Sequence, residues 1–186
     1  MQVDIDVFLK LAEKAGAVAM LDIEATGLRA DYNSVLVVSF KPHGKRPISF
    51  TASKAGDDRS LMEQITKEMA KYQVIVTYYG KGFDAPMLES RLLFHNMPPL
   101  PKHHHLDMYW LVKGRLKTAR RSQAHLLEWL SLPEEKMTLS ADVWNQVCSN
   151  FDETIGTLVK RCESDVRGLE VLYDRCKHLQ RNVALY

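Results

Sequence analysis

The sequence has no long hydrophobic run and little cysteine. No stretch of 18 apolar residues occurs in the 186-residue chain, so no segment is predicted to span a membrane. Its three cysteines, Cys148, Cys162 and Cys176, match no zinc-ligand spacing and leave one thiol unpaired in any disulfide scheme. A reducing compartment, the cytoplasm, is therefore expected. The opening MQVDIDVFLK carries two acids before its first base, which is unlike a secretory signal peptide.

The chain also lacks internal repeats, low-complexity stretches and any long linker rich in proline and glycine. A content of 46% hydrophobic and 26% charged residues is that of an ordinary globular protein. The length predicts a single domain over residues 1–186. The formal net charge of +2 does not by itself indicate nucleic-acid binding.

Apolar runs of strand length are interspersed with segments of helical periodicity. Strands are predicted at 17–25, 35–40, 47–52, 73–79 and 104–106. Helices are predicted at 5–15, 57–72 and 84–96, from 107 onward, and at about 122–131, 140–149 and 152–179. Because strands come early and helices late, the expected fold class is α/β, with a mixed five-stranded sheet flanked by helices and a helical C-terminal half.

Two acids lie inside the first, otherwise apolar, predicted strand. Since side chains alternate faces along a strand, Asp22 and Glu24 share one face about 7 Å apart. Ionised carboxylates in such a place are costly unless they are paired or bound to a cation. The turn at Thr26 and Gly27 ends the strand, and open α/β sheets bind ligands at the carboxyl ends of their strands.

Two further acids have both a structural and a chemical interpretation. Asp84 is either the N-cap of the helix that begins there or, if the first and fourth strands are adjacent, a neighbour of Asp22 and Glu24. Asp165 falls on the apolar stripe of the last helix, where it either pairs with Arg161 or completes a carboxylate cluster. A cluster with oxygen ligands alone suits Mg²⁺ or Mn²⁺, and two such ions can stabilise both reacting oxygens of a phosphodiester.

Three segments resemble the motifs of a known enzyme family. LDIEATGL at 21–28 resembles the first motif of the DEDD superfamily of 3′–5′ exonucleases, TYYGKGFDAPML at 77–88 resembles the second, and RCESDVRGLEVLY at 161–173 resembles the third. Their order and spacing match over almost the whole chain. The resemblance is to the predicted exonucleases of bacteria and phages, and it implies a ribonuclease-H-like fold.

The resemblance also implies an activity and its residues. The family hydrolyses phosphodiester bonds and releases nucleotides from the 3′ end of DNA or RNA. Four catalytic carboxylates would hold two Mg²⁺ or Mn²⁺ ions: Asp22, Glu24, Asp84 and Asp165. The backbone around Thr26, Gly27 and Leu28 would hold the terminal nucleotide.

One departure from the family pattern concerns the general base. The family has a Tyr four residues, or a His five residues, before its last Asp, where this chain has Arg161 and Lys160. A guanidinium is not a base, so Arg161 would bind the scissile phosphate or pair with Asp165. Other base candidates are His103–His105 and Tyr79. A catalytically weak or inactive nucleic-acid-binding domain and a structure-specific endonuclease are the alternatives.

Asp107 follows the three histidines and has two interpretations. It is either the N-cap of the helix that begins at Met108 or a group near the site, holding water or a histidine. The histidines themselves are not expected to share a metal ion, because adjacent side chains diverge.

A basic segment follows that helix. Five cations with no acid between them are candidates for nucleic-acid binding: Lys113, Arg115, Lys117, Arg120 and Arg121. Their concentration in one segment favours a surface that follows a phosphate backbone, with a solvated basic loop as the alternative. Tyr109, Trp110 and Phe83 could stack on bases, although each also suits a core.

Overall fold

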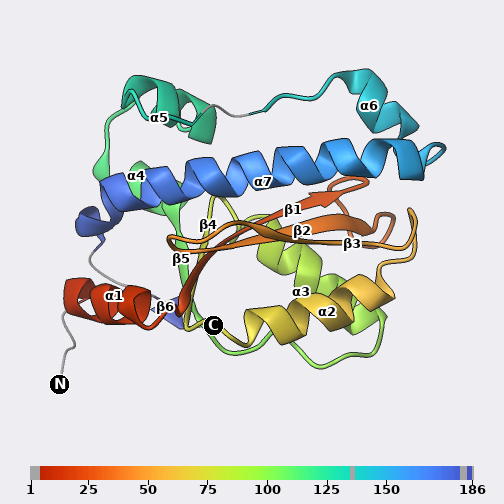
Figure 1. Ribbon diagram of the computed structural model, residues 1–186, viewed down its shortest axis with the longest axis horizontal. Coiled ribbons are helices and arrows are strands. Elements are labelled where there is room, and N and C mark those ends of the chain that lie inside the picture. The colour runs from red at the N-terminus through yellow and green to blue at the C-terminus, as the bar shows by residue number, and fades with distance from the viewer. Residues whose placement is uncertain (1–4, 135–136, 181–183, 186) are drawn as a thin grey trace.

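A computed structural model describes residues 5–134, 137–180 and 184–185, and residues 1–4, on which the signal-peptide prediction partly rests, lie outside this range. The described residues form one sheet with strand order β3-β2-β1-β4-β5-β6 (Figure 1). The strands are β1 (Val18–Ala25), β2 (Val35–Pro42), β3 (Ile48–Thr51), β4 (Val74–Thr77), β5 (His104–Asp107) and β6 (Ala184–Leu185). β1, β4 and β5 are parallel, and the other strands run antiparallel to their neighbours. The predicted mixed sheet of five strands is confirmed, and the two-residue β6 adds to it.

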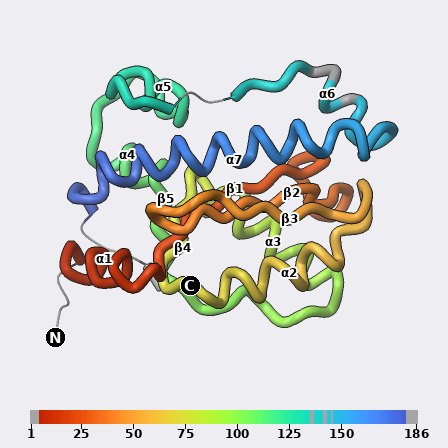
Figure 2. Tube along the Cα trace, in the orientation of Figure 1, coloured from red at the N-terminus to blue at the C-terminus, as the bar shows by residue number. Residues whose placement is uncertain are grey.

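The helices cover both faces of this sheet (Figure 1 and Figure 2). They are α1 (Ile5–Lys14), α2 (Arg59–Met69), α3 (Asp84–Phe94), α4 (Met108–Arg115), α5 (Gln123–Trp129), α6 (Ala141–Gln146) and α7 (Phe151–Cys176), followed by a short 3-10 turn, η1 (Lys177–Leu179). α7 crosses one face with α5 and α6 outside it, whereas α2 and α3 lie on the other face. The predicted α/β class with a helical C-terminal half is therefore confirmed. Within the described residues, none of these helices is both long and apolar enough to cross a bilayer.

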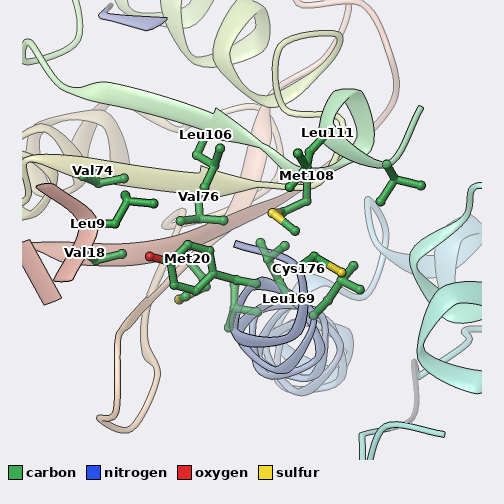
Figure 3. Close-up of a cluster of buried hydrophobic side chains, with 14 of the residues drawn as sticks. Leu9, Val18, Met20, Val74, Val76, Leu106, Met108, Leu111, Leu169 and Cys176 are labelled. Atoms are coloured by element: carbon green, nitrogen blue, oxygen red, sulfur yellow. The ribbon is translucent and has the colours of Figure 1, made fainter. Parts of the chain in front are cut away.

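The core is divided by the sheet, because alternate residues of each strand point to opposite faces. Val18 and Met20 of β1 join Val74 of β4 and Leu169 of α7 in one fully apolar cluster (Figure 3). Leu21, which follows Met20 and points to the opposite face of the strand, belongs instead to the cluster under α2 and α3. The face of β1 that packs on α7 therefore continues, with the same period, from Met20 to Asp22 and Glu24.

A buried ion pair fastens the α2–α3 side of the sheet. Asp58, directly before α2, is 0% exposed and accepts hydrogen bonds from the backbone N–H of Val35 (2.9 Å) and from Arg91 Nε (2.8 Å) and Nη2 (2.9 Å). His95 Nε2 lies 2.6 Å from the same carboxylate. Burial raises the pKa of Asp58, but the hydrogen bonds from Arg91 and His95 outweigh it, and the pKa is lowered. The negative charge of Asp58 is therefore neutralised within the fold, chiefly by Arg91.

Candidate functional site

Three carboxylates from distant parts of the chain meet where β1 ends. Asp22 and Glu24 come from β1 and Asp165 from α7, and one carboxylate oxygen of each lies within 4.8 Å of the other two. Glu24 and Asp165 are buried, at 4% and 3% exposure, and Asp22 is half-buried. Carboxylates that are this close and poorly hydrated repel one another unless a cation lies among them. The structure brings together three of the four acids that the sequence singles out.

The local structure explains why these three side chains converge. Asp22 and Glu24 share the face of β1 that packs on α7, because strand side chains alternate with period two. Leu169, one turn beyond Asp165, is buried in the core of that face (Figure 3), so the helix presents Asp165 toward β1. The pairing of β1 with β2 also shifts register between Glu24 and Ala25. Such bulges redirect side chains where strand pairing ends.

Asp84 is the first residue of α3, the helix that follows β4, and its carboxyl interacts electrostatically with Asp22. β4 pairs with β1 in parallel, and α3 begins at Asp84 shortly after β4 ends. The N-cap of α3 is Phe83, so the alternative that Asp84 caps this helix is wrong. Burial, and then the charges of Asp22 and Asp107, raise the pKa of Asp84 well above its usual value, against the effect of backbone hydrogen bonds that include one at Ile23. Asp84 is outside the group of three, but its ionisation depends on Asp22.

Arg161 places a positive charge inside this acidic group. Its Nη1 donates to both carboxylate oxygens of Glu24, which is 137 residues away in sequence. Its Nη2 lies 3.9 Å from Asp165 Oδ2, so the predicted pair with Asp165 is present but longer. The guanidinium carbon is 5.5 Å from the centre of the Trp144 ring on α6. Because a guanidinium does not lose its proton, this charge is permanent.

The thiol of Cys162 also contacts the cluster. Its Sγ donates to the backbone carbonyl of Asp22 at 3.2 Å and lies 3.4 Å from Asp22 Oδ2. Cys162 is fully buried, and burial, followed by the charges of Asp22 and Glu24, raises its pKa well above the usual value. The thiol therefore stays protonated and holds Asp22 as a donor. Sequence reasoning missed this contact, because Cys162 is one more small apolar position on the stripe of α7.

Asp107 organises the turn between β4 and α3. Its carboxylate accepts hydrogen bonds from the backbone N–H of Tyr109 (3.0 Å), Tyr79 (2.9 Å) and Lys81 (2.9 Å). The N-cap prediction is thus confirmed, and the same carboxylate also holds the turn that leads to Asp84. Tyr79 has a φ of 65°, and a Cβ at Gly82 would lie 2.5 Å from its ring. Since a left-handed backbone is strained for tyrosine, the hydrogen bonds that the backbone N–H groups of Tyr79 and Lys81 donate to Asp107 help to keep this turn in place.

The loop after β1 has a fixed beginning and an exposed apolar tip. Thr26 Oγ1 donates to Asn33 Oδ1 (3.1 Å) and accepts from the backbone N–H of Ser34 (3.1 Å). Gly27 packs closely on the same side chain, because an added Cβ would lie 2.5 Å from Asn33 Oδ1. Leu28 is 82% exposed. The predicted nucleotide contacts of this loop remain a prediction, and the loop stands directly beside the carboxylates.

The basic segment lies on the surface from α4 to the start of α5. Its five members are exposed: Lys113, Arg115, Lys117, Arg120 and Arg121. Within the described part of the chain, none of them forms an ion pair with an acid. Arg121 lines a shallow cavity of about 520 Å³ together with Tyr78, Tyr79, Tyr109, Ala119 and Ser122. Tyr79 therefore belongs both to this cavity and to the turn that Asp107 holds beside the carboxylates.

The histidines make separate contacts around β5. His105 Nε2 lies 2.7 Å from the hydroxyl of Thr77, and burial lowers the pKa of His105 to about 3. His103 Nδ1 lies 2.7 Å from the carbonyl oxygen of Pro101, and burial also lowers the pKa of His103. Neither belongs to the potential metal-binding groups found among the described residues. Their suggested part as a general base remains a prediction.

Comparison with known proteins gives a family and a structural relative. A family model described as the RNase_H superfamily matches residues 19–177. The fold resembles the family B DNA polymerase from the hyperthermophilic archaeon Pyrobaculum calidifontis, with a TM-score of 0.65 and 21% identity over 85% of this chain. The match covers 24% of the polymerase chain, so it concerns the fold of one part of that enzyme. No curated protein matches the sequence.

Proposed function

Because this chain belongs to the RNase_H superfamily, we propose that it is a metal-dependent 3′–5′ exonuclease of the DEDD type. In this proposal residues 1–186 form one exonuclease domain. The domain hydrolyses phosphodiester bonds of DNA or RNA and releases nucleotides from a 3′ end. The residues that hold two Mg²⁺ or Mn²⁺ ions are Asp22, Glu24, Asp84 and Asp165.

The convergence of the carboxylates is the observation that carries this proposal. All donors are oxygen atoms, which Mg²⁺ and Mn²⁺ prefer. One oxygen each of Asp22, Glu24 and Asp165 lies within 4.8 Å of the other two, and opposite ligands of a Mg²⁺ ion bound at ~2.1 Å are ~4.2 Å apart, so the three carboxylates are near enough to share an ion. The raised pKa of Asp84 reflects negative charge and burial that a bound cation would offset. The residues present therefore fit divalent cations.

Bound divalent ions lower the pKa of an attacking water and stabilise the charge on the phosphodiester oxygens. This chain determines where that chemistry takes place. Cys162 orients Asp22 through its thiol, and Asp107 fixes the turn that leads to Asp84. Groups that orient ligands in this way typically change affinity or activity by about 10–100-fold when they are removed.

In this proposal no side chain of α7 accepts the proton of the attacking water. Arg161 occupies the position of the family's tyrosine, and a guanidinium has no acceptor. Lys160 occupies the position of the family's histidine, and it is exposed to solvent. The proton would pass either to solvent, on the side where Asp22 is half-buried, or to one of the other base candidates, Tyr79 and His103–His105.

The surface formed by the tyrosine-lined cavity and the basic segment suits a single-stranded substrate. The cavity lined by Tyr78, Tyr79 and Tyr109 offers aromatic faces, on which unpaired bases stack with about 1–3 kcal/mol each. The exposed cations of the basic segment continue from Arg121 and would follow the phosphate backbone. We therefore propose that a single-stranded 3′ end runs from the basic segment over the tyrosines to Asp22.

The test is cleavage of a single-stranded oligonucleotide labelled at its 5′ end, with Mn²⁺, Mg²⁺ or EDTA. We expect a ladder that shortens from the 3′ end with either ion and no cleavage in EDTA. Asp22→Asn should reduce the rate more than about a hundredfold, the upper range for losing a group that only orients a ligand. Asp152→Asn, which removes an exposed acid at the start of α7, is the matched control and should cleave like the wild type. Absence of cleavage with every divalent ion would contradict the proposal.

A second candidate function is nucleic-acid binding without turnover. It is favoured by Arg161, which replaces the family's tyrosine and contacts Glu24. In that case the oligonucleotide would bind with an affinity that falls steeply with salt, and no ladder would form. The remaining alternative, a structure-specific endonuclease, is tested with a circular single strand, because an endonuclease cuts a circle and an exonuclease does not.

A further inference from the structure

Arg161 occupies the position from which a cation would neutralise Glu24. Its Nη1 donates to both oxygens of a carboxylate that is only 5% exposed, and Nη2 faces Asp165. The Trp144 ring lies 5.5 Å from the guanidinium carbon and covers the group from the side of α6. Helix α7, which carries Arg161, and helix α6, which carries Trp144, thus hold the guanidinium against Glu24.

A divalent ion and this guanidinium cannot share Glu24 without strong repulsion. A Mg²⁺ ion binds a carboxylate oxygen at about 2.1 Å, and both oxygens of Glu24 already face Nη1. Like charges a few ångströms apart repel strongly where water is largely excluded, and neither charge can be neutralised by deprotonation. One of the two cations has to move away from Glu24 before the other can bind closely.

From this arrangement we infer that Arg161 is an internal cation that competes with a divalent ion for Glu24. The inference rests on the proposed function, since it concerns ions held by the same carboxylates. In the ion-free state the guanidinium stabilises Glu24 beside Asp165. When an ion binds, the Arg161 side chain, which is 22% exposed, turns toward solvent and away from the Trp144 ring.

The competition predicts that removing the guanidinium strengthens ion binding. An adjacent charge within about 4–6 Å changes a carboxylate's affinity for a proton by roughly 10–1000-fold, and we expect a comparable effect on a divalent cation. Arg161→Gln should therefore bind Mn²⁺ at least about tenfold more tightly than the wild type. Arg161→Lys keeps the charge and should stay within about threefold of the wild type.

Isothermal titration calorimetry of the full chain with MnCl₂ measures this effect without any nuclease assay. The matched control is Arg167→Gln on the same helix, because Arg167 pairs with Glu134 and Glu163 rather than with the cluster. That control should bind Mn²⁺ like the wild type. Equal or weaker Mn²⁺ binding by Arg161→Gln would overturn the inference while leaving the exonuclease proposal standing. Absence of Mn²⁺ binding in every variant would overturn both.

The wild-type chain gives a second readout that does not depend on the folding of a variant. Because the guanidinium lies over Trp144, its departure should change the emission of that tryptophan when MgCl₂ is added in the absence of substrate. Trp144→Phe should abolish the Mg²⁺-dependent change, since the remaining tryptophans, Trp110 and Trp129, are on α4 and α5. Emission that does not respond to Mg²⁺ at concentrations that saturate binding would count against the competition.

Discussion

Two buried acidic sites in this chain contain the same kinds of side chain and have opposite electrostatics. At Asp58, one carboxylate receives donors from Arg91, His95 and a backbone N–H, and the pKa of Asp58 is lowered in spite of burial. At the end of β1, several carboxylates lie together, and burial and the charge of Asp22 raise the pKa of Asp84.

The difference lies in how many carboxylates one guanidinium faces. Arg91 gives two of its N–H groups to a single acid, whereas the guanidinium of Arg161 faces both Glu24 and Asp165. A balanced buried pair holds the fold together, and removing one partner leaves an uncompensated charge. Several acids around one guanidinium instead leave negative charge that an external cation would offset. The comparison separates an acid that is balanced within the fold from acids that the proposed function assigns to divalent cations.

The largest expected contrast is in the cost of removing one acid from each site. Asp58→Asn leaves Arg91 buried without its counter-charge, so it should lower the free energy of unfolding by about 3–5 kcal/mol. Asp22→Asn relieves repulsion, so in EDTA it should change that free energy by less than about 1 kcal/mol or raise it. Urea unfolding followed by circular dichroism measures both. Similar losses for the two variants would remove the distinction between the sites.

Divalent ions should stabilise the chain through one of these sites alone. Mn²⁺ at about 100 times its dissociation constant should add about 2.7 kcal/mol to the free energy of unfolding of the wild type. Asp22→Asn should lose most of this gain, and His95→Gln, which weakens the Asp58 site, should keep it. Thermal melts with and without Mn²⁺ give the comparison. A gain that survives Asp22→Asn would place the ion elsewhere.

The two sites should also respond to pH in opposite directions when EDTA is present. The pKa of Asp84 is raised in the folded state. Its contribution to the free energy of unfolding is therefore complete below the ordinary pKa of 3.8 and is lost as the pH rises through the folded pKa. The lowered pKa of Asp58 means that its contribution is complete above 3.8 and is lost as the pH falls through the folded pKa. Asp84→Asn should flatten the loss on the alkaline side, by up to about 1.4 kcal/mol per pH unit. Unfolding free energies between about pH 3 and 8 measure it, and an unchanged alkaline slope would contradict the assignment.

The smallest expected effect concerns the thiol that holds Asp22. Cys162→Ala removes a weak hydrogen-bond donor and a sulfur atom from a fully buried position, so we expect a loss of about 1 kcal/mol in the free energy of unfolding. Mn²⁺ affinity should fall by about tenfold, the low end of the effect of removing a group that orients a ligand, because Asp22 keeps its place on β1. Cys148→Ala, at an exposed cysteine, is the control and should leave both quantities unchanged. Calorimetry and urea unfolding distinguish the two variants.

Sequence periodicity predicted the elements well because each signal is local. The alternation in β1 placed Asp22 and Glu24 on one face, and the stripe of α7 placed Asp165 on its packed face, as the structure has them. The capping preference of Asp predicted Asp107 correctly and misled for Asp84, where Phe83 is the N-cap and the carboxylate is buried. That error has a physical reason, since a cap preference describes an exposed helix end and says nothing about the strand beside it.

The contacts between different helices and strands could not be predicted from sequence periodicity. An apolar stripe indicates that Cys162 is buried, but not that its sulfur points at Asp22. The helical spacing of Arg161 and Asp165 predicts their pair, whereas the contact with Glu24 depends on how α7 crosses β1. Asp107 also accepts a hydrogen bond from the backbone N–H of Tyr79, and this contact likewise depends on β5 lying next to β4.

The sequence alone determined which segments form strands and helices and on which face of its element each acid lies, because backbone geometry sets these over a few residues. Only the tertiary structure decided which charges meet. Glu24 and Arg161 are 137 residues apart, and their contact follows from the packing of a whole helix on a whole sheet. Whether an acid is paired with a guanidinium, as at Asp58, or lies among other acids, as at Asp22, is therefore a property of the assembled fold.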